Sequence, residues 1–205
     1  MSCIPVTSKN IIDTLNTLTQ QWHIDDGLFF NEVDNTFINQ AVITHRFNFQ
    51  LWHEEDIARM RNIADSKIAE VKRAIDGFNQ SRNDSIQEWD SKMVYLLDKS
   101  GIKPTLDVPM NSETPGSIAD RISIMSLKIF HMAEQLNRTD VDEQHIKSCQ
   151  TKLHTLQQQQ QDLGECLDQL QIEFFNGTKR LKVYFQHKMY NDPTLNPALY
   201  GNLSK

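Results

Sequence analysis

Polar residues interrupt two apolar helical stripes of this sequence, and their types suit the binding of an anion. His45 lies in the middle of the apolar face of its predicted helix, with Trp52 and Asp56 within about 20° of it on a helical wheel. Arg82 interrupts the stripe of the next helix. A guanidinium, an imidazole and amide groups beside aromatic rings can hold an anionic small molecule between helices. The predicted pocket comprises Arg82, His45, Asp56, Glu55, Asn79, Asn48 and Trp52.

These residues predict one ion pair and leave two roles open for the polar group as a whole. A buried cation costs several kcal/mol unless a carboxylate lies beside it, so we expect Arg82 to pair with Asp56 or Glu55. One role is structural, in which satisfied polar groups fix the register of the helices. The other is functional, with His45 as a general base and Asp56 and Glu55 as further catalytic candidates. Whether the protein is an enzyme stays open at this point.

A second group of hydrogen-bond donors surrounds a predicted helix start. Thr114 is a typical N-cap residue and Pro115 suits the first helical position. Free backbone N–H groups at such a start attract anions, although the same residues can serve as caps alone. Further along this helix, Asp120 and His131 share one face and either line a second interface or reach the pocket. The side chains expected to add ligand contacts at the helix start are Ser112, Thr114, Ser117 and Arg121, with Asn111 beside them.

A third group lies in the segment 178–190, TKRLKVYFQHKMY, which holds four lysines and arginines and no acid. Aromatic rings between the charges can stack on a sugar or a base while the cations contact phosphate. We therefore expect Lys182, Tyr184 and Lys188 to close the pocket. The alternative is a segment whose side-chain stems pack on the core and whose charges stay in water.

Long helices must carry these groups, because apolar residues recur at alternating spacings of three and four over most of the chain. The pattern of the fifth helix is typical of a bundle or of an antiparallel helical pair. Helices are predicted over 8–22, 36–61, 65–97, from Thr114 to about Leu136, and over 141–175.

The predicted fold class is all-α, an elongated helical bundle with two long antiparallel helices and an irregular C-terminal tail. We expect residues 1–205 to form a single all-helical domain. Its parts are an N-terminal helix and connector (1–35), the bundle core (36–175), and a basic segment with a turn-rich tail (176–205).

The composition excludes several classes of protein. The chain has 205 residues and a formal net charge of −6, which argues against nucleic-acid binding. No stretch approaches the roughly 20 apolar residues that span a bilayer, and no signal peptide is evident. We therefore expect a cytoplasmic protein without membrane insertion. Zinc-protease, di-iron and P-loop motifs are absent, so no metal site is predicted and no cofactor is assigned.

Four stretches carry a pattern that extends over much of the chain. They are LWHEED (51–56), VKRAID..NQ.RND (71–84), NSETPGSI.DR.SI..LKI.HM (111–132) and KVY.Q.KMYNDP.LNPALY (182–200). Together they resemble a bacterial family known as the domain of unknown function number 4254. The resemblance covers roughly residues 35–200 and implies an all-helical, cytoplasmic bacterial protein. Members are often encoded near glycosyltransferases for surface polysaccharide, which hints at sugar chemistry, but the resemblance implies no catalytic residue.

These observations predict that the protein binds, and if it is an enzyme processes, an anionic small molecule such as a phosphorylated sugar or a nucleotide. The alternative is a non-catalytic helical scaffold that docks a partner such as a glycosyltransferase or forms a homodimer. A cavity that holds His45 and Arg82 would favour the first function. A dry, fully paired polar layer with an exposed apolar stripe would favour the second.

Overall fold

Five α-helices make up most of the protein in a computed structural model, which describes residues 4–25, 27–185, 189 and 193–197. They are α1 (Ser8–Ile24), α2 (Thr36–Ala58), α3 (Asp65–Lys99), α4 (Pro115–Glu134) and α5 (Glu143–Phe175), and a short 3-10 helix, Gln135–Asn137, follows α4. The helix ends predicted from the sequence agree with these bounds to within three residues. The all-α fold class is therefore confirmed.

Local side-chain caps explain where four of the helices begin. At each start, a side-chain oxygen accepts a hydrogen bond from an N–H group of the first turn, which has no partner within the helix. The predicted role of Thr114 as a cap is confirmed, and Pro115 lies in the first turn of α4. The four capping residues are Thr7, Asn35, Thr114 and Asp142.

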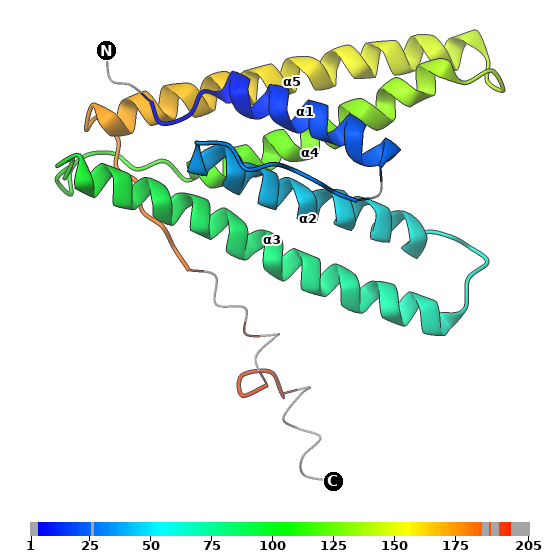
Figure 1. Cartoon of the computed structure of the whole chain (residues 1–205), viewed down its shortest axis with the longest axis horizontal. Coiled ribbons are helices and arrows are strands. Elements are labelled where there is room, and N and C mark those ends of the chain that lie inside the picture. Colours follow the sequence, from blue (N-terminus) through cyan, green and yellow to red (C-terminus); the bar gives the residue numbers. More distant parts are fainter. Residues whose placement is uncertain (1–3, 26, 186–188, 190–192, 198–205) are drawn as a thin grey trace.

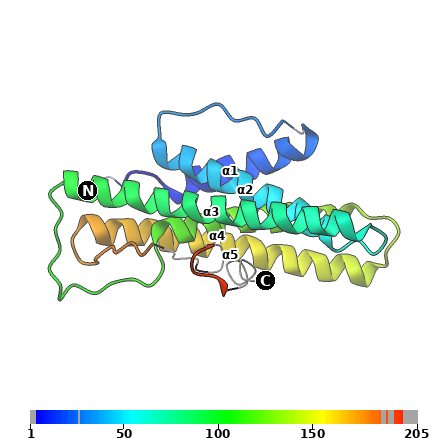
Figure 2. The same cartoon turned by 90° about the horizontal axis from the view of Figure 1, so that it is seen from below.

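The helices form two antiparallel hairpins, α2–α3 and α4–α5, and α1 packs against α2, α4 and α5 (Figure 1). The two long helices, α3 and α5, run in the same direction in both views (Figures 1 and 2). Each long helix therefore has a shorter helix as its antiparallel neighbour. This corrects the prediction of two long antiparallel helices, because a heptad pattern shows that a helix has an apolar seam but not which helix covers it.

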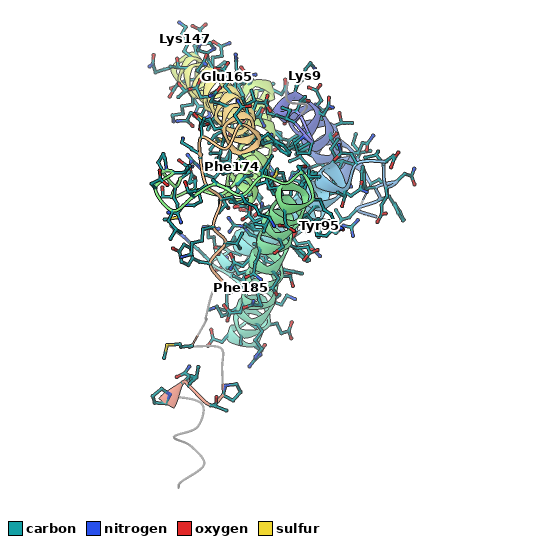
Figure 3. The ribbon with its side chains drawn as sticks, turned by 90° about the vertical axis from the view of Figure 1, so that its left-hand side faces the viewer. Lys9, Tyr95, Lys147, Glu165, Phe174 and Phe185 are labelled. Atoms are coloured by element: carbon teal, nitrogen blue, oxygen red, sulfur yellow. The ribbon has the colours of Figure 1, made fainter. Side chains whose placement is uncertain are left out.

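One hydrophobic cluster draws residues from all five helices. Leu15, Val42, Trp89, Ile122 and Phe174, one from each helix, are all at most 1% exposed. Figure 3 labels Phe174 near the centre of the molecule, where the end of α5 meets the other helices. Burying a side chain of this kind contributes about 2 kcal/mol, so the mutual packing of the helices stabilises the fold more than any single helix can.

The start of α1 is fastened to α5 by a polar contact. The backbone N–H and the hydroxyl of Ser8 donate to the two carboxylate oxygens of Asp168 at 2.8 and 2.7 Å. Gly164 makes room for this contact, because a Cβ there would lie 3.0 Å from the Ser8 hydroxyl. The helices α1 and α5 can therefore approach closely at this point.

The segment after α5 returns the chain to the side of α3. It turns at Gly177, whose positive φ of 69° favours glycine, and then joins the loop before α4. There Arg180 donates its backbone N–H to Pro109 O at 3.0 Å and its Nε to Val108 O at 3.2 Å. These bonds hold the first part of the tail beside α3, while Phe185 further on is 62% exposed (Figure 3).

Candidate functional site

A chain of buried hydrogen bonds links α1, α2 and α4 through His45. Its Nε2 lies 3.0 Å from the Thr19 hydroxyl of α1, and its Nδ1 lies 2.8 Å from the Ser123 hydroxyl of α4. Asn48 donates its amide N–H groups to Ser123 Oγ and to Asp120 Oδ1, both at 2.9 Å. We call these five residues, together with Arg82, the polar layer.

Arg82 completes the polar layer from α3, and its partner is Asp120 of α4. Its Nε donates to Asp120 Oδ1 at 2.8 Å and its Nη2 donates to the other carboxylate oxygen. These bonds raise the pKa of Arg82 above its ordinary value, so it stays charged. The predicted pairing of Arg82 with Asp56 or Glu55 is wrong. Glu55 pairs with Arg59 one turn away, because that carboxylate points along its own helix.

His45 is satisfied and has no access to a ligand. Its side chain is 0% exposed and its ring stacks on Trp22 at a centroid distance of 5.1 Å. Burial lowers its pKa to about 3, so it is neutral at physiological pH. Thr19 donates its own hydroxyl proton to Leu15 O, so His45 donates Nε2–H to Thr19 and accepts from Ser123 at Nδ1. This arrangement favours the structural role for His45 over that of a general base.

Several of the remaining predicted pocket residues line a cavity of about 410 Å³ between α2, α3 and α4. We call it the Trp52 cavity. The ring of Trp52 stacks on His131 of α4, with centroids 4.6 Å apart. Asn79 is half-buried but does not line this cavity. The lining residues are Asn48, Leu51, Trp52, Glu55, Asp56, Arg59, Arg82, Ile124 and Leu127.

A second cavity of about 530 Å³ lies between α3, the start of α4 and the segment after α5. We call it the Asp90 cavity. It brings together five predicted ligand-binding residues from segments far apart in the sequence, namely Ser112, Thr114, Ser117, Lys182 and Tyr184. Lys182 and Tyr184 come from the returning segment, and the Lys182 ammonium lies 4.8 Å from the centre of the Tyr184 ring. The other lining residues are Asn83, Ile86, Gln87, Asp90, Met110, Asn111 and Val183.

Asp90 is the most unusual group of this cavity. It is 3% exposed, and its Oδ1 accepts the backbone N–H of Gly116 at 2.7 Å. Burial raises its pKa from 3.8 to about 6, although hydrogen bonds from Thr114 and Gly116 oppose the rise. The Thr114 hydroxyl in turn lies 2.9 Å from the Ser117 hydroxyl. A carboxyl group that exchanges its proton near neutral pH therefore adjoins two hydroxyl groups that line the same cavity.

The sequence prediction missed Asp90, although its spacing contains a signal. Asp90 follows Ile86 by four residues and precedes Met93 by three, so it lies on the buried stripe of α3. A carboxylate at a position of the apolar stripe is as clear a sequence signal of a buried charged group as the guanidinium of Arg82. The bond to Gly116 could not be read from this pattern, because it depends on how closely α3 and α4 approach.

The start of α4 does not offer free N–H groups in the way the sequence suggests. Asp90 accepts from Gly116, and the Thr114 hydroxyl accepts the backbone N–H of Ser117 at 3.2 Å. Arg121 lies outside the Asp90 cavity and bonds to Glu113 at 2.7 Å. The capping alternative therefore accounts for these backbone groups, and the hydroxyls remain as ligand contacts. Lys188 lies outside the described residues.

Comparison with known proteins places the chain in a family. The sequence model of the family described as "Protein of unknown function (DUF4254)" matches residues 39–183. The chain belongs to this family. No curated protein and no solved structure matches it.

The part of the chain that matches DUF4254 contains both cavities almost entirely. It includes every lining residue of the Asp90 cavity except Tyr184, and every lining residue of the Trp52 cavity.

Within the described residues, no helix is long and apolar enough to cross a bilayer. In that same part of the chain, no group of three or more His, Cys, Asp or Glu side chains is arranged to hold a metal ion.

Proposed function

We propose that the protein binds an anionic small molecule, a phosphorylated sugar or a nucleotide, in the Asp90 cavity. One observation carries this proposal. Three segments that are far apart in the sequence meet around a buried carboxylate and bring hydroxyl, amide, ammonium and phenol groups into one cavity of about 530 Å³. A pocket of this size, with a few polar groups that converge, is typical of small-molecule sites.

The lining chemistry suits a polyol that carries a phosphate. Asn83, Gln87 and Asp90 lie about one helical turn apart on α3 and offer amide and carboxylate groups that can bond to hydroxyls. Lys182 supplies an ammonium with three N–H donors for a phosphate. Tyr184 is 66% exposed, so its ring offers a flat face to a sugar or a base.

The Trp52 cavity suits an anion less well. Its two cations are already engaged, Arg82 by Asp120 and Arg59 by Glu55. Asp56 adds a further negative charge to the lining. An anionic ligand there would have to compete with these internal carboxylates.

We include processing of the ligand in the proposal because of Asp90. A carboxyl group whose pKa is raised to about 6 can take or give a proton at neutral pH, which is what general acid–base catalysis requires. The family resemblance is consistent with a cytoplasmic bacterial protein that acts in surface polysaccharide biosynthesis.

Thermal unfolding in the presence of sugar phosphates, nucleotide sugars and nucleotides tests the proposal. A ligand at about 100 times its Kd adds roughly 2.7 kcal/mol, which raises the Tm by a few degrees. Lys182→Met should remove most of this shift. Lys99→Met is the matched control, because Lys99 also lies over a tyrosine ring, that of Tyr95, but neither residue lines the cavity. A ligand-induced shift that both variants retain would contradict the assignment of this cavity.

A helical scaffold is the second candidate, and one observation favours it. Ile24 and Phe29, at the end of α1 and in the connector that follows, are 88% and 76% exposed. Exposed apolar side chains five residues apart in the sequence suit a contact with a protein partner or a homodimer. Light scattering over a range of protein concentrations tests the homodimer, and Phe29→Ser should weaken it. If no ligand of the panel raises the Tm, and the average molar mass rises with protein concentration, the scaffold function is favoured over ligand binding.

A further inference from the structure

Three histidines from three helices meet beside the end of α1. The ring centroid of His23 in α1 lies 5.2 Å from that of His53 in α2 and 4.9 Å from that of His131 in α4. His53 and His131 are 6.2 Å apart. We call this group the histidine junction. Phe49 and Phe130 pack against its rings at 4.8 and 3.9 Å from His23.

In two of the junction's rings Nδ1 has a hydrogen-bond partner and Nε2 has none. His23 Nδ1 donates to Thr19 O at 2.6 Å, and His131 Nδ1 donates to Glu134 Oε2 at 2.8 Å. The Nε2 atoms of both rings are buried and have no hydrogen-bond partner. In the neutral ring Nε2 is only an unpaired acceptor, whereas in the protonated ring it is a charged donor without an acceptor. Protonation of His23 is therefore less compatible with this packing than neutrality, because its buried Nε2–H would have no acceptor.

The charges around the junction do not offset the free-energy cost of protonating His23 and His53 there. The groups that act on His23 and His53 are the other histidines, Glu134 of α4 and Asp56 of α2. Burial first, and the neighbouring histidines second, lower the pKa of both His23 and His53 below 6.5. The hydrogen bond to Thr19 and the charge of Glu134 oppose this for His23, and Asp56 and Glu134 oppose it for His53. Glu54 lines the same cavity of about 340 Å³ as His23 and His53.

The other elements packed nearby add no further charge to this cavity. From α3 only the ring of Phe78 reaches it. His45, about two helical turns before His53 on α2, remains neutral at physiological pH because burial lowers its pKa to about 3.

We infer that the histidine junction is a pH-sensitive contact that holds the end of α1 against α2 and α4 at neutral pH and releases it on acidification. Released His23 and His53 take up protons more readily than they do in the packed junction, so both shift the equilibrium toward release as the pH falls below 6.5. Release would expose the rings of Phe49 and Phe130. The inference does not depend on the proposed ligand of the Asp90 cavity.

Hydrogen exchange at pH 7.5 and pH 5.5, corrected for the intrinsic exchange rate, tests this inference on the full chain. We expect protection in the last two turns of α1 to fall at least about tenfold more than protection in the middle of α5, because one proton taken up changes an equilibrium tenfold per pH unit. His53→Phe keeps an aromatic ring among Phe49, His23 and His131 but removes one proton site, so it should reduce the difference. His154→Gln, at an exposed position of α5, is the matched control and should behave like the wild type.

Equal loss of protection in α1 and α5, or a loss that His53→Phe does not reduce, would overturn the inference. If His53→Phe does not fold, a nuclear magnetic resonance titration of the wild-type histidine rings decides instead. The pKa values of His23 and His53 should then lie below the ordinary histidine value of 6.5, and values at or above 6.5 would overturn the inference. Stabilisation by Zn²⁺ that disappears in His53→Phe would also overturn it, because metal binding would then explain the unpartnered Nε2 atoms.

Discussion

Replacing Asp90 by asparagine should make the protein more stable at pH 8. The ionised carboxylate is 3% exposed, and it accepts hydrogen bonds from the Gly116 N–H and the Thr114 hydroxyl. Asparagine keeps an oxygen that can accept the Gly116 N–H and adds an amide that can donate to Thr114. The change therefore removes a buried charge and preserves the hydrogen bonds.

The magnitude follows from the pKa of Asp90. A folded-state pKa raised from 3.8 to about 6 means that the stabilising contribution of the protonated group is complete below pH 3.8 and is lost as the pH rises through 6. The full loss corresponds to about 3 kcal/mol. We therefore expect Asp90→Asn to exceed the wild type by about 1 to 3 kcal/mol at pH 8, and to lose this advantage near pH 4.

Urea unfolding followed by circular dichroism at pH 8, 6 and 4.5 measures the difference, provided that the m-value does not change. Asp84→Asn is the matched control, because Asp84 is exposed on the same helix and its replacement should change stability by only a few tenths of a kcal/mol. An Asp90→Asn protein that is less stable than the wild type at pH 8, with a difference independent of pH, would refute the reasoning. If the variant is more stable and also loses the stabilisation that a ligand gives, Asp90 contributes to ligand binding and lowers the free energy of unfolding of the ligand-free protein.

Three further predictions test the packing of the helices. Gly116→Ala should destabilise the protein by about 2 kcal/mol, because the added Cβ would lie 2.6 Å from a backbone carbonyl oxygen of α3. Gly77→Ala is the control on the same helix pair and should stabilise the protein by up to about 1 kcal/mol, because an added Cβ there meets nothing within 4 Å. Thermal unfolding should therefore show a lower Tm for the first variant and a higher Tm for the second. Arg82→Met should cost about 2 to 3 kcal/mol in urea unfolding, because Asp120 would keep its bond from Asn48 but lose its neutralising cation. Adding Asp120→Leu should recover much of that loss, and additive costs would contradict the pairing. The pKa of about 3 for His45 predicts that the free energy of unfolding falls by up to about 1.4 kcal/mol per pH unit below pH 6.5. His45→Gln should be less stable at pH 7, but its free energy of unfolding should depend less steeply on pH. An unchanged pH dependence would exclude His45 as the cause.

The helices could be predicted because the signals that specify them are local. Alternating spacings of three and four mark the buried face of each helix, and capping residues such as Thr114 mark where helices begin. The same spacing identified His45 and Arg82 as buried polar residues. It could equally have identified Asp90, whose position in the stripe of α3 is of the same kind.

The partners of these residues could not be predicted in this way. Arg82 bonds to Asp120, which lies 38 residues further along the chain, rather than to the nearer candidates on α2. The predicted single pocket becomes two cavities, and His45 lines neither of them. The residues Ser112, Thr114, Ser117, Lys182 and Tyr184 do share a cavity, but they surround a carboxylate that the sequence prediction had not considered.

The sequence by itself determined the helical class, the approximate ends of the helices and which side chains are buried, because each depends on neighbours within a few turns. The tertiary structure alone decided which helices pair, which carboxylate neutralises Arg82, how deeply Asp90 is buried, and which histidines lie beside His23. These features depend on the distance and orientation between helices. That geometry is set by the packing of the whole core, and the spacing of residues along one helix does not encode it.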